Sequence, residues 1–474
     1  MKVSGKIMSA ALVASLLLTG SACGGSSRPS GNAGGDADPA ETTTTTVILT
    51  TEDLEQDDID NPVDISEFVD DSADKLDDPN ITYLGYYDIR TSADIKPAVK
   101  LFQETYGGEI EYNQCTWSER IEKLQVLIAS GDSPDLVDRE GESFPLLASK
   151  NVYEDLTDYI DLSQPQWAGF EQLVNQYEWN GKHVYYPWHV SALPTYVYYS
   201  NTRFEEYGVT SPRDLYSGGE WDWNTFRDTI KKFMDASGSS NEVYGVYGLT
   251  MPFAAIASTG TGTIGIENGK LSNNINSPAI DRAASFLESL RRDGLTIAQD
   301  GYWGDQGAPI AEGKACFLVG GQYLLKGFQT DYPEADVQFV PFPKDPEADK
   351  YYNGVDTFGY LVPKGAKNIK GSAAFINMNR LCKIDPDLRA VVDESRMTKD
   401  KWTEEQIEFM KQFEDISNYD VVVDLYSGLD SDTSGIINDM FVDVTFYPDR
   451  DTWTVLRDTN LNVINAAIDE INNG

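Results

Sequence analysis

Three short segments decide the fold of this chain: ITYLGYY at 81–87, EIEY at 109–112 and PDLV at 134–137. The first is a run of apolar, β-branched and aromatic residues, which is typical of a buried strand. The other two have the same character over fewer residues, and Gly131 to Pro134 supplies a turn before the third. The sequence therefore predicts three strands within about sixty residues, with room for one helix between each pair.

Amphipathic helices are predicted in both intervals. In the first interval, apolar residues recur at the helical period, at Ile95, Ala98, Val99, Phe102 and Tyr106. In the second, Thr116 and Glu119 have capping-box spacing and precede the apolar residues Ile121, Leu124, Leu127 and Ile128. Strand, helix, strand, helix, strand predicts a doubly wound α/β sheet of mainly parallel strands, whose ligands bind at the carboxyl ends of the strands.

The first residues have the layout of an export signal. Lys2 and Lys6 begin it, and an apolar run too short to span a membrane leads through small residues to Cys23. The cysteine after small residues resembles a bacterial lipobox, although Gly20 stands where that pattern prefers an aliphatic residue. We expect a signal peptide over 1–22, lipidation at Cys23 and a chain anchored on the extracellular face of the cell membrane. An ordinary secreted protein cut nearby is the alternative.

Residues 23–79 are predicted to form a disordered acidic tether. Small residues come first, then the threonine run 42–46, and then a stretch from Glu52 to Asp78 whose only basic residue is Lys75. Like charges repel and such a segment buries little apolar surface, so we expect it to stay extended and mobile.

Composition excludes several function classes. The 474 residues are enough for two domains, and 41% of them are hydrophobic. The formal net charge of -40 argues against nucleic acid or an anionic membrane surface as a partner, because phosphate binding needs an excess of Lys and Arg. Cys115, Cys316 and Cys382 have no CxxC spacing, which argues against a disulfide scaffold or zinc module and favours buried free thiols over a single disulfide.

Six segments resemble, in the same order, motifs of the extracellular solute-binding proteins of sugar ABC transporters, a maltose-binding-protein-like family. They are SGDSPDLV at 130–137, NVYEDLT at 151–157, NGKHVYYP at 180–187, VYYSN at 197–201, WDWNTF at 221–226 and EGKACF at 312–317. The resemblance covers most of residues 80–474. It implies a two-lobed periplasmic-binding-protein-like fold, in which each lobe is a mainly parallel sheet flanked by helices and crossing hinge strands join the lobes.

The resemblance also implies where the chain crosses between lobes. Crossings are expected near 187–193, between 343 and 354, and near 420–430. The N-lobe would then comprise 80–188 and 350–420, and the C-lobe 189–349 and 421–474.

A sugar site needs aromatic rings for the C–H faces of the sugar and carboxylates or amides for its hydroxyls. Position along the predicted loops and the resemblance together suggest these ligand-binding residues: Asp88, Trp117, Glu142, Trp188, His189, Tyr302, Trp303, Tyr323 and Asp356. Glu142 is reached by counting from the PD motif to the position of an acid in maltose binders. For Glu142 the alternative is a solvated loop acid, for Trp117 a cover over a helix start, and for His189 a structural hinge contact.

No catalytic motif is found, since GxSxG, HExxH and Walker patterns are all missing from the sequence. Gly260 to Gly265 matches GxGxxG, but no clear strand precedes it, and we interpret it as a loop. We expect no cofactor, no metal and no enzyme activity. The predicted function is a monomeric receptor that captures a sugar or oligosaccharide by hinge closure and delivers it to an ABC importer. Alternatives are a receptor for an amino sugar, polyamine or peptide, and a surface glycan-active enzyme.

Overall fold

The computed structural model describes residues 51–60, 62–70, 73, 75–191, 196–238, 243–267, 269–297, 306–414 and 420–473. All of them belong to one unit, Ile48–Gly474. The expected signal peptide, Cys23 and the tether up to residue 50 lie outside the described residues, as do Tyr302 and Trp303. No helix of the described residues is both long enough and apolar enough to cross a membrane.

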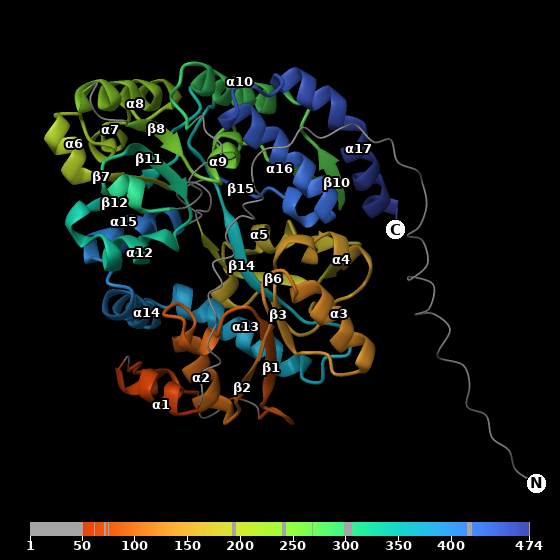
Figure 1. Ribbon diagram of the computed structural model, residues 1–474. Helices are drawn as coiled ribbons and strands as arrows, with labels where there is room; N and C mark the ends of the chain where they lie inside the picture. Colours follow the sequence, from red (N-terminus) through yellow and green to blue (C-terminus); the bar gives the residue numbers. More distant parts are fainter. Residues whose placement is uncertain are drawn as a thin grey trace, which may run out of the picture. The chain divides into compact units, whose positions relative to one another are not determined.

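The strands form a five-stranded sheet, a four-stranded sheet and small two-stranded ladders (Figure 1). Their bounds are β1 (Ile81–Gly85), β2 (Ile110–Gln114), β3 (Leu136–Asp138), β4 (Glu178–Trp179), β5 (Lys182–His183), β6 (Tyr185–Ser191), β7 (Tyr196–Ser200), β8 (Tyr244–Tyr247), β9 (Ile264–Glu267), β10 (Lys270–Asn273), β11 (Ala315–Gly320), β12 (Val337–Pro341), β13 (Tyr352–Gly354), β14 (Asp356–Leu361) and β15 (Asp420–Val422).

Helices surround both sheets. The α-helices are α1 (Thr51–Asp60), α2 (Lys96–Tyr106), α3 (Arg120–Ser130), α4 (Leu146–Ser149), α5 (Glu171–Asn175), α6 (Asn201–Tyr207), α7 (Pro212–Ser217), α8 (Trp223–Ser237), α9 (Met251–Ala257), α10 (Pro278–Arg292), α11 (Ala308–Ala311), α12 (Leu324–Asp331), α13 (Ile369–Ile384), α14 (Pro386–Lys399), α15 (Glu404–Glu414), α16 (Ser431–Phe446) and α17 (Trp453–Asn473). Short 3-10 turns are η1 (Ser66–Phe68), η2 (Ile89–Thr91), η3 (Gly141–Ser143), η4 (Pro165–Trp167), η5 (Pro333–Ala335) and η6 (Tyr426–Gly428).

The five-stranded sheet has the order β2-β1-β3-β14-β6 and defines the first lobe. β1 pairs in parallel with β2 and β3, with Tyr83 opposite both Tyr112 and Leu136. β14 alone runs the other way, antiparallel to β3 and β6. The predicted succession of strand, helix, strand, helix and strand over 81–138 is confirmed, with α2 and α3 as the two helices.

The four-stranded sheet has the order β12-β7-β11-β8 and defines the second lobe. β8 is parallel to β11, and β7 is antiparallel to β11 and β12, so β7 is the reversed strand. Every residue of β7 and β11 is buried, which is typical of strands covered on both faces. Both sheets are mainly parallel with one reversed strand, which confirms the predicted fold class.

The helix α10 shows how local sequence determines the outer layer of the second lobe. The Ser277 side chain accepts from the Ile280 amide, and Pro278 occupies the first turn, where its missing N–H costs nothing. The residues of this helix that are buried recur at helical spacing and are Ile280, Ala283, Ala284, Leu287 and Leu290. They form a single apolar stripe, which packs α10 onto α9 and α16.

Strands at three places link the lobes. β6 of the first sheet leads through residues 192–195 to β7 of the second, and β12 is followed by β13 and β14. β15 pairs in parallel with β13. The expected crossings and the lobe boundaries drawn from them stay predictions.

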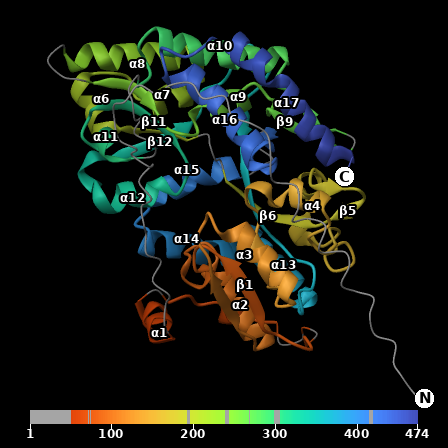
Figure 2. The same ribbon diagram turned by 45° about the vertical axis from the view of Figure 1, so that its right-hand side comes forward.

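α15 differs from the expected N-lobe segment 350–420. Its Phe409 contacts Phe339 of β12 at a ring distance of 5.5 Å, and its Phe413 contacts Tyr196 of β7 at 5.9 Å. In Figure 2, α15 lies with α12 and β12, whereas α14 lies with the first lobe. We therefore place the end of that first-lobe segment near Asp400.

The acidic stretch before the first lobe is partly ordered, which corrects the expectation of an extended tether up to residue 79. α1 occupies 51–60, and its Asp57 pairs with Lys96 at 2.8 Å and with Lys399 at 3.1 Å. Ile65 is 1% exposed within the core of the chain. Self-repulsion of the acidic residues is offset here because lysines of the first lobe neutralise them, a contact that the local composition does not reveal.

Candidate functional site

A cavity of about 600 Å³ opens beside the ends of β6 and β14 and is lined by both lobes. We call it the aromatic cavity. Its lining residues are Tyr86, Tyr87, Thr91, Ser92, Ala93, Asp94, Ile95, Trp117, Glu140, Trp188, His189, Gln322, Tyr323, Lys326, Asp356, Phe358, Lys399, Asp400 and Trp402. The volume lies within the range usual for small-molecule sites, and aromatic rings with a few polar groups are their usual lining.

A β-bulge builds the floor of this cavity. His189 is opposite Phe358 and Pro187 is opposite Gly359, which leaves Trp188 as an extra residue on β6. Adjacent strand residues normally point to opposite faces, but a bulge redirects one of them. Trp188 and His189 accordingly both line the cavity, with rings 5.8 Å apart and nearly parallel.

Gly359 allows the close approach of strands at this bulge. A Cβ atom there would lie 2.6 Å from the Tyr185 ring and 2.6 Å from the Tyr186 carbonyl oxygen, so any larger side chain would push the two strands apart.

Two aromatic residues from the loops of the first lobe form one side of the cavity. Trp117 follows β2 and keeps 48% of its surface exposed. The Arg120 guanidinium lies 3.8 Å from the centre of the indole, and Tyr86 meets it edge-on at 5.2 Å. These contacts hold the Trp117 ring while leaving much of it open, as a stacking platform requires.

Carboxyl groups lie at the base of the same side. Glu140 accepts a hydrogen bond from the Tyr86 hydroxyl at 3.0 Å, and Asp356 accepts one from Arg139 at 3.1 Å. Burial, and then the negative charges of Asp356 and Asp138, raise the pKa of Glu140 to about 8. Burial likewise raises the pKa of Asp138, which accepts from the Tyr83 hydroxyl, to about 7. At neutral pH, Glu140 therefore carries a proton and donates as well as accepts hydrogen bonds.

The second lobe contributes α12 and the turn before it. Tyr323, the residue before α12, is 57% exposed, and Lys326 of α12 pairs with Asp400 at 2.9 Å. That ion pair joins α12 to the segment between α14 and α15, which also carries Trp402 into the cavity.

Two of the tryptophans that line the cavity have a buried indole N–H for which the described residues offer no acceptor. Nε1 of Trp188 and Nε1 of Trp402 are buried and make no hydrogen bond with any described residue. The two residues are 3% and 6% exposed. A buried donor without an acceptor costs about 1–3 kcal/mol.

The structure brings five of the nine residues expected from sequence into this cavity, namely Trp117, Trp188, His189, Tyr323 and Asp356. Tyr302 and Trp303 lie outside the described residues. Asp88 does not line the cavity, because its carboxylate accepts from the Arg90 backbone and pairs with the Arg90 guanidinium within its own turn.

Glu142 does not line the cavity either, and Glu140 does. The backbone is extended at Glu140 and then turns into η3 at Gly141, whose φ of 50° is in the left-handed region. Counting along the chain from the PD motif therefore selects a residue past the turn. The sequence does contain a signal for Glu140, because it is the first acidic residue after the end of β3.

Other residues of the cavity came from segments that sequence reasoning did not connect to it. Trp402 follows α14, Phe358 is on β14, and Asp94 is held by Lys383 at 3.0 Å and Arg396 at 2.7 Å. No motif marks these residues, and only long-range packing brings them together.

The glycine loop 260–265 is occupied by the chain itself. Asp424 accepts from the backbone amides of Thr263 at 2.7 Å and Ile264 at 3.1 Å. A phosphate would need these same amide groups, which argues against a phosphate site here. The sequence alone predicts a loop over the motif, but its last two residues, Ile264 and Gly265, begin β9. Within the described residues, no three His, Cys, Asp or Glu side chains are grouped to hold a metal ion. Cys115, Cys316 and Cys382 are buried free thiols.

Comparison with known families identifies the architecture. Residues 88–378 match the family model described as bacterial extracellular solute-binding protein. This chain belongs to that family. The match begins just before η2 and ends within α13, so it includes the second sheet of the solute-binding protein, every strand of the first sheet except β1, and most of the aromatic cavity. No curated protein sequence matches the chain.

Solved structures share the fold of this solute-binding protein. An ABC substrate-binding protein of Listeria monocytogenes, in complex with cycloalternan, has 19% identity and a TM-score of 0.58 over 84% of this chain and 99% of its own. The GacH receptor of Streptomyces glaucescens, solved with acarbose, has 14% identity and a TM-score of 0.59 over 82% and 98%. UgpB of Mycobacterium tuberculosis, in complex with glycerophosphocholine, has 16% identity and a TM-score of 0.62 over 82% and 99%.

Proposed function

We propose that this solute-binding protein captures a sugar or oligosaccharide in the aromatic cavity and delivers it to an ABC importer. The observation that carries the proposal is the pairing of exposed rings from different lobes, Trp117 and Tyr323, around one cavity that Glu140 and Asp356 also line. Rings suit the C–H faces of a sugar, and the polar groups suit its hydroxyls.

Closure of the lobes is the proposed mechanism of capture. Both lobes line the cavity, so a bound solute contacts both and stabilises the arrangement in which they approach each other. In the same proposal the chain is a monomer without enzyme activity. Acylated Cys23 holds it on the extracellular face of the membrane, and the segment between Cys23 and α1 separates the lobes from that surface.

The solved relatives support a carbohydrate first and leave a second class open. Cycloalternan and acarbose are the occupants named for two of them, and glycerophosphocholine is the occupant named for the third. The second candidate for this chain is a solute with an ammonium group, such as an amino sugar. Asp356 favours it, because a carboxylate beside aromatic rings also suits a cation.

A thermal-shift screen of the mature chain tests the proposal. The panel would contain mono- and oligosaccharides, amino sugars, polyamines and short peptides. A true solute raises the melting temperature in proportion to ln(1 + [L]/Kd), and tryptophan fluorescence should change with the same Kd. The oligosaccharide should be recovered intact. A panel without any saturable shift, or recovery of hydrolysed product, would overturn the proposed receptor.

A further inference from the structure

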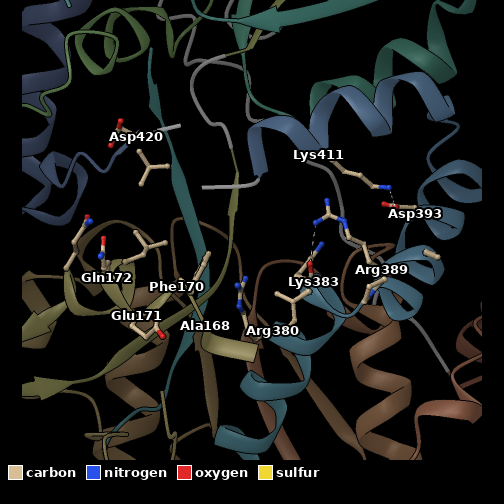
Figure 3. Close-up of a pocket in the computed structure, with 17 residues that line it drawn as sticks. Ala168, Phe170, Glu171, Gln172, Arg380, Lys383, Arg389, Asp393, Lys411 and Asp420 are labelled. Carbon is tan, nitrogen blue, oxygen red and sulfur yellow. Dashed lines mark hydrogen bonds and ion pairs between the residues drawn. The ribbon is translucent and has the colours of Figure 1, made fainter. Parts of the chain in front are cut away.

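A second cavity lies on the other side of β6 from the aromatic cavity. It has a volume of about 900 Å³ and is lined by the turn from η4 into α5, the junction of α13 and α14, and parts of α15 and β15. Four basic side chains line it, Arg380, Lys383, Arg389 and Lys411, and we call it the basic cavity (Figure 3). This is unexpected in a chain with a net charge of -40.

Arg380 is the central residue of the basic cavity. It is 7% exposed, and its guanidinium lies 3.7 Å from the centre of the Phe170 ring. Nε donates to the Gln166 carbonyl at 2.8 Å and Nη1 donates to the Trp188 carbonyl at 3.2 Å. These carbonyls orient the guanidinium without neutralising it, and no carboxylate of the described residues forms an ion pair with Arg380.

A second guanidinium adds to the positive charge. Arg389 of α14 donates to the Lys383 carbonyl at 3.3 Å, and in Figure 3 both lie on the same side of the cavity as Arg380. Burial, and then the positive charge of Arg389, lower the pKa of Arg380 to about 10. A buried cation is expected to be paired, so the position of Arg380 favours an anion from outside the chain.

The acids of the cavity do not fill that role. Asp393 is held by Lys411 at 2.7 Å, and Asp420 pairs with Lys350. Glu171 also lines the cavity but forms no ion pair with Arg380. Charges separated by more than about 8 Å are screened at physiological ionic strength. The charged side chains that line the basic cavity therefore affect a bound anion more than the net charge of the whole chain does.

We propose that the basic cavity binds a small oxyanion, with Arg380 and Arg389 as its ligands. The planar fork of a guanidinium matches the two oxygens of a carboxylate or phosphate, and a bound anion would offset the buried charge of Arg380. The site is separate from the aromatic cavity, although Arg380 contacts the backbone of Trp188, whose ring lines that cavity.

Calorimetric titration of the mature chain with inorganic phosphate and with citrate tests this site. Chloride at matched ionic strength is the blank, and no solute is present, so the result does not depend on the proposed function. We expect one saturable site, and the ratio of the two affinities shows whether phosphate or carboxylate is preferred. Absence of saturable binding by both anions would overturn the proposal.

Variants assign the site to the two arginines. Arg380→Gln should abolish anion binding, and Arg389→Ala should weaken it by at least about tenfold, which corresponds to about 1.4 kcal/mol. Lys232→Ala, an exposed lysine of α8 in the second lobe, removes the same charge elsewhere and should bind like the unaltered chain. If circular dichroism shows that Arg380→Gln does not fold, Arg389→Ala alone decides. Unaltered affinity in the folded arginine variants would place the anion elsewhere and contradict the proposal.

Discussion

The two sides of the aromatic cavity are built unequally in the part of the chain that the structure describes. The first lobe supplies two loop aromatics, a protonated Glu140 and the bulged strand β6. The second lobe supplies α12 and the turn before it, with the exposed ring of Tyr323 and the Lys326–Asp400 ion pair. The first side is fixed by many contacts, whereas the second is an exposed edge.

This difference indicates an order of binding. A solute would first satisfy the polar groups and rings of the first lobe, and the second lobe would then cover it. Affinity would depend mainly on the first side, and the lifetime of the complex on the second. The following variants test that division.

Trp188→Ala should have the largest effect, because Trp188 belongs to the floor shared by both sides. Its ring packs within 6.2 Å of the rings of Phe358 and Tyr360. Removing a large buried aromatic should lower the free energy of unfolding by about 3–5 kcal/mol and abolish solute binding. Urea unfolding measures the first effect. A variant as stable as the unaltered chain would show that the bulge does not support the site.

Trp117→Ala should weaken solute binding by about 10- to 100-fold, because loss of a central aromatic contact costs about 1.4–2.8 kcal/mol. Since the ring is 48% exposed, the free energy of unfolding should change little. Calorimetry with the solute found in the thermal-shift screen measures the effect. Trp117→Phe is the matched control and should retain most of the affinity. Equal losses in both variants would argue against stacking.

Tyr323→Ala should weaken binding by no more than about tenfold, mainly through faster dissociation, as is usual for changes at one interface. Stopped-flow fluorescence separates the two rates. A loss larger than that of Trp117→Ala would reverse the order of binding proposed for the two lobes.

Glu140→Gln should make stability less dependent on pH. The folded chain holds the Glu140 proton up to about pH 8, whereas an unfolded chain releases it near pH 4.3, so the free energy of unfolding falls as pH rises between these values. At pH 8 the variant should be more stable than the unaltered chain by several kcal/mol, since the loss of about 1.4 kcal/mol per pH unit accumulates over the interval between the two pKa values. Some slope should remain, because the pKa of Asp138 is about 7.

The matched control is Glu142→Gln, which removes the same charge two residues away. It should leave both the pH dependence and solute affinity unchanged. If Glu142→Gln instead weakens binding while Glu140→Gln does not, then Glu142, the residue selected by counting from the PD motif, belongs to the site.

Sequence reasoning predicted much of the fold and part of the site. The alternating strands and helices over 81–138 follow from patterns within each segment. So do the burial of the three cysteines and the resemblance to the family over residues 80–474. Trp117, Tyr323 and Asp356 were found because each stands at the end of a strand or beside a family motif, and both kinds of position can be read along the chain.

The sequence by itself determined the α/β architecture, because a strand or helix is specified by the period of apolar residues within one segment. Only the tertiary structure decided which side chains of the loops and strand ends line the cavity. The bulge at Trp188 depends on the strand opposite it, and the choice of Glu140 over Glu142 depends on the turn at Gly141. The docking of Asp57 on Lys96 and Lys399, and the charge of Arg380 behind β6, depend on residues far apart in the chain. Burial and charge pairing arise only between segments, and no local pattern contains them.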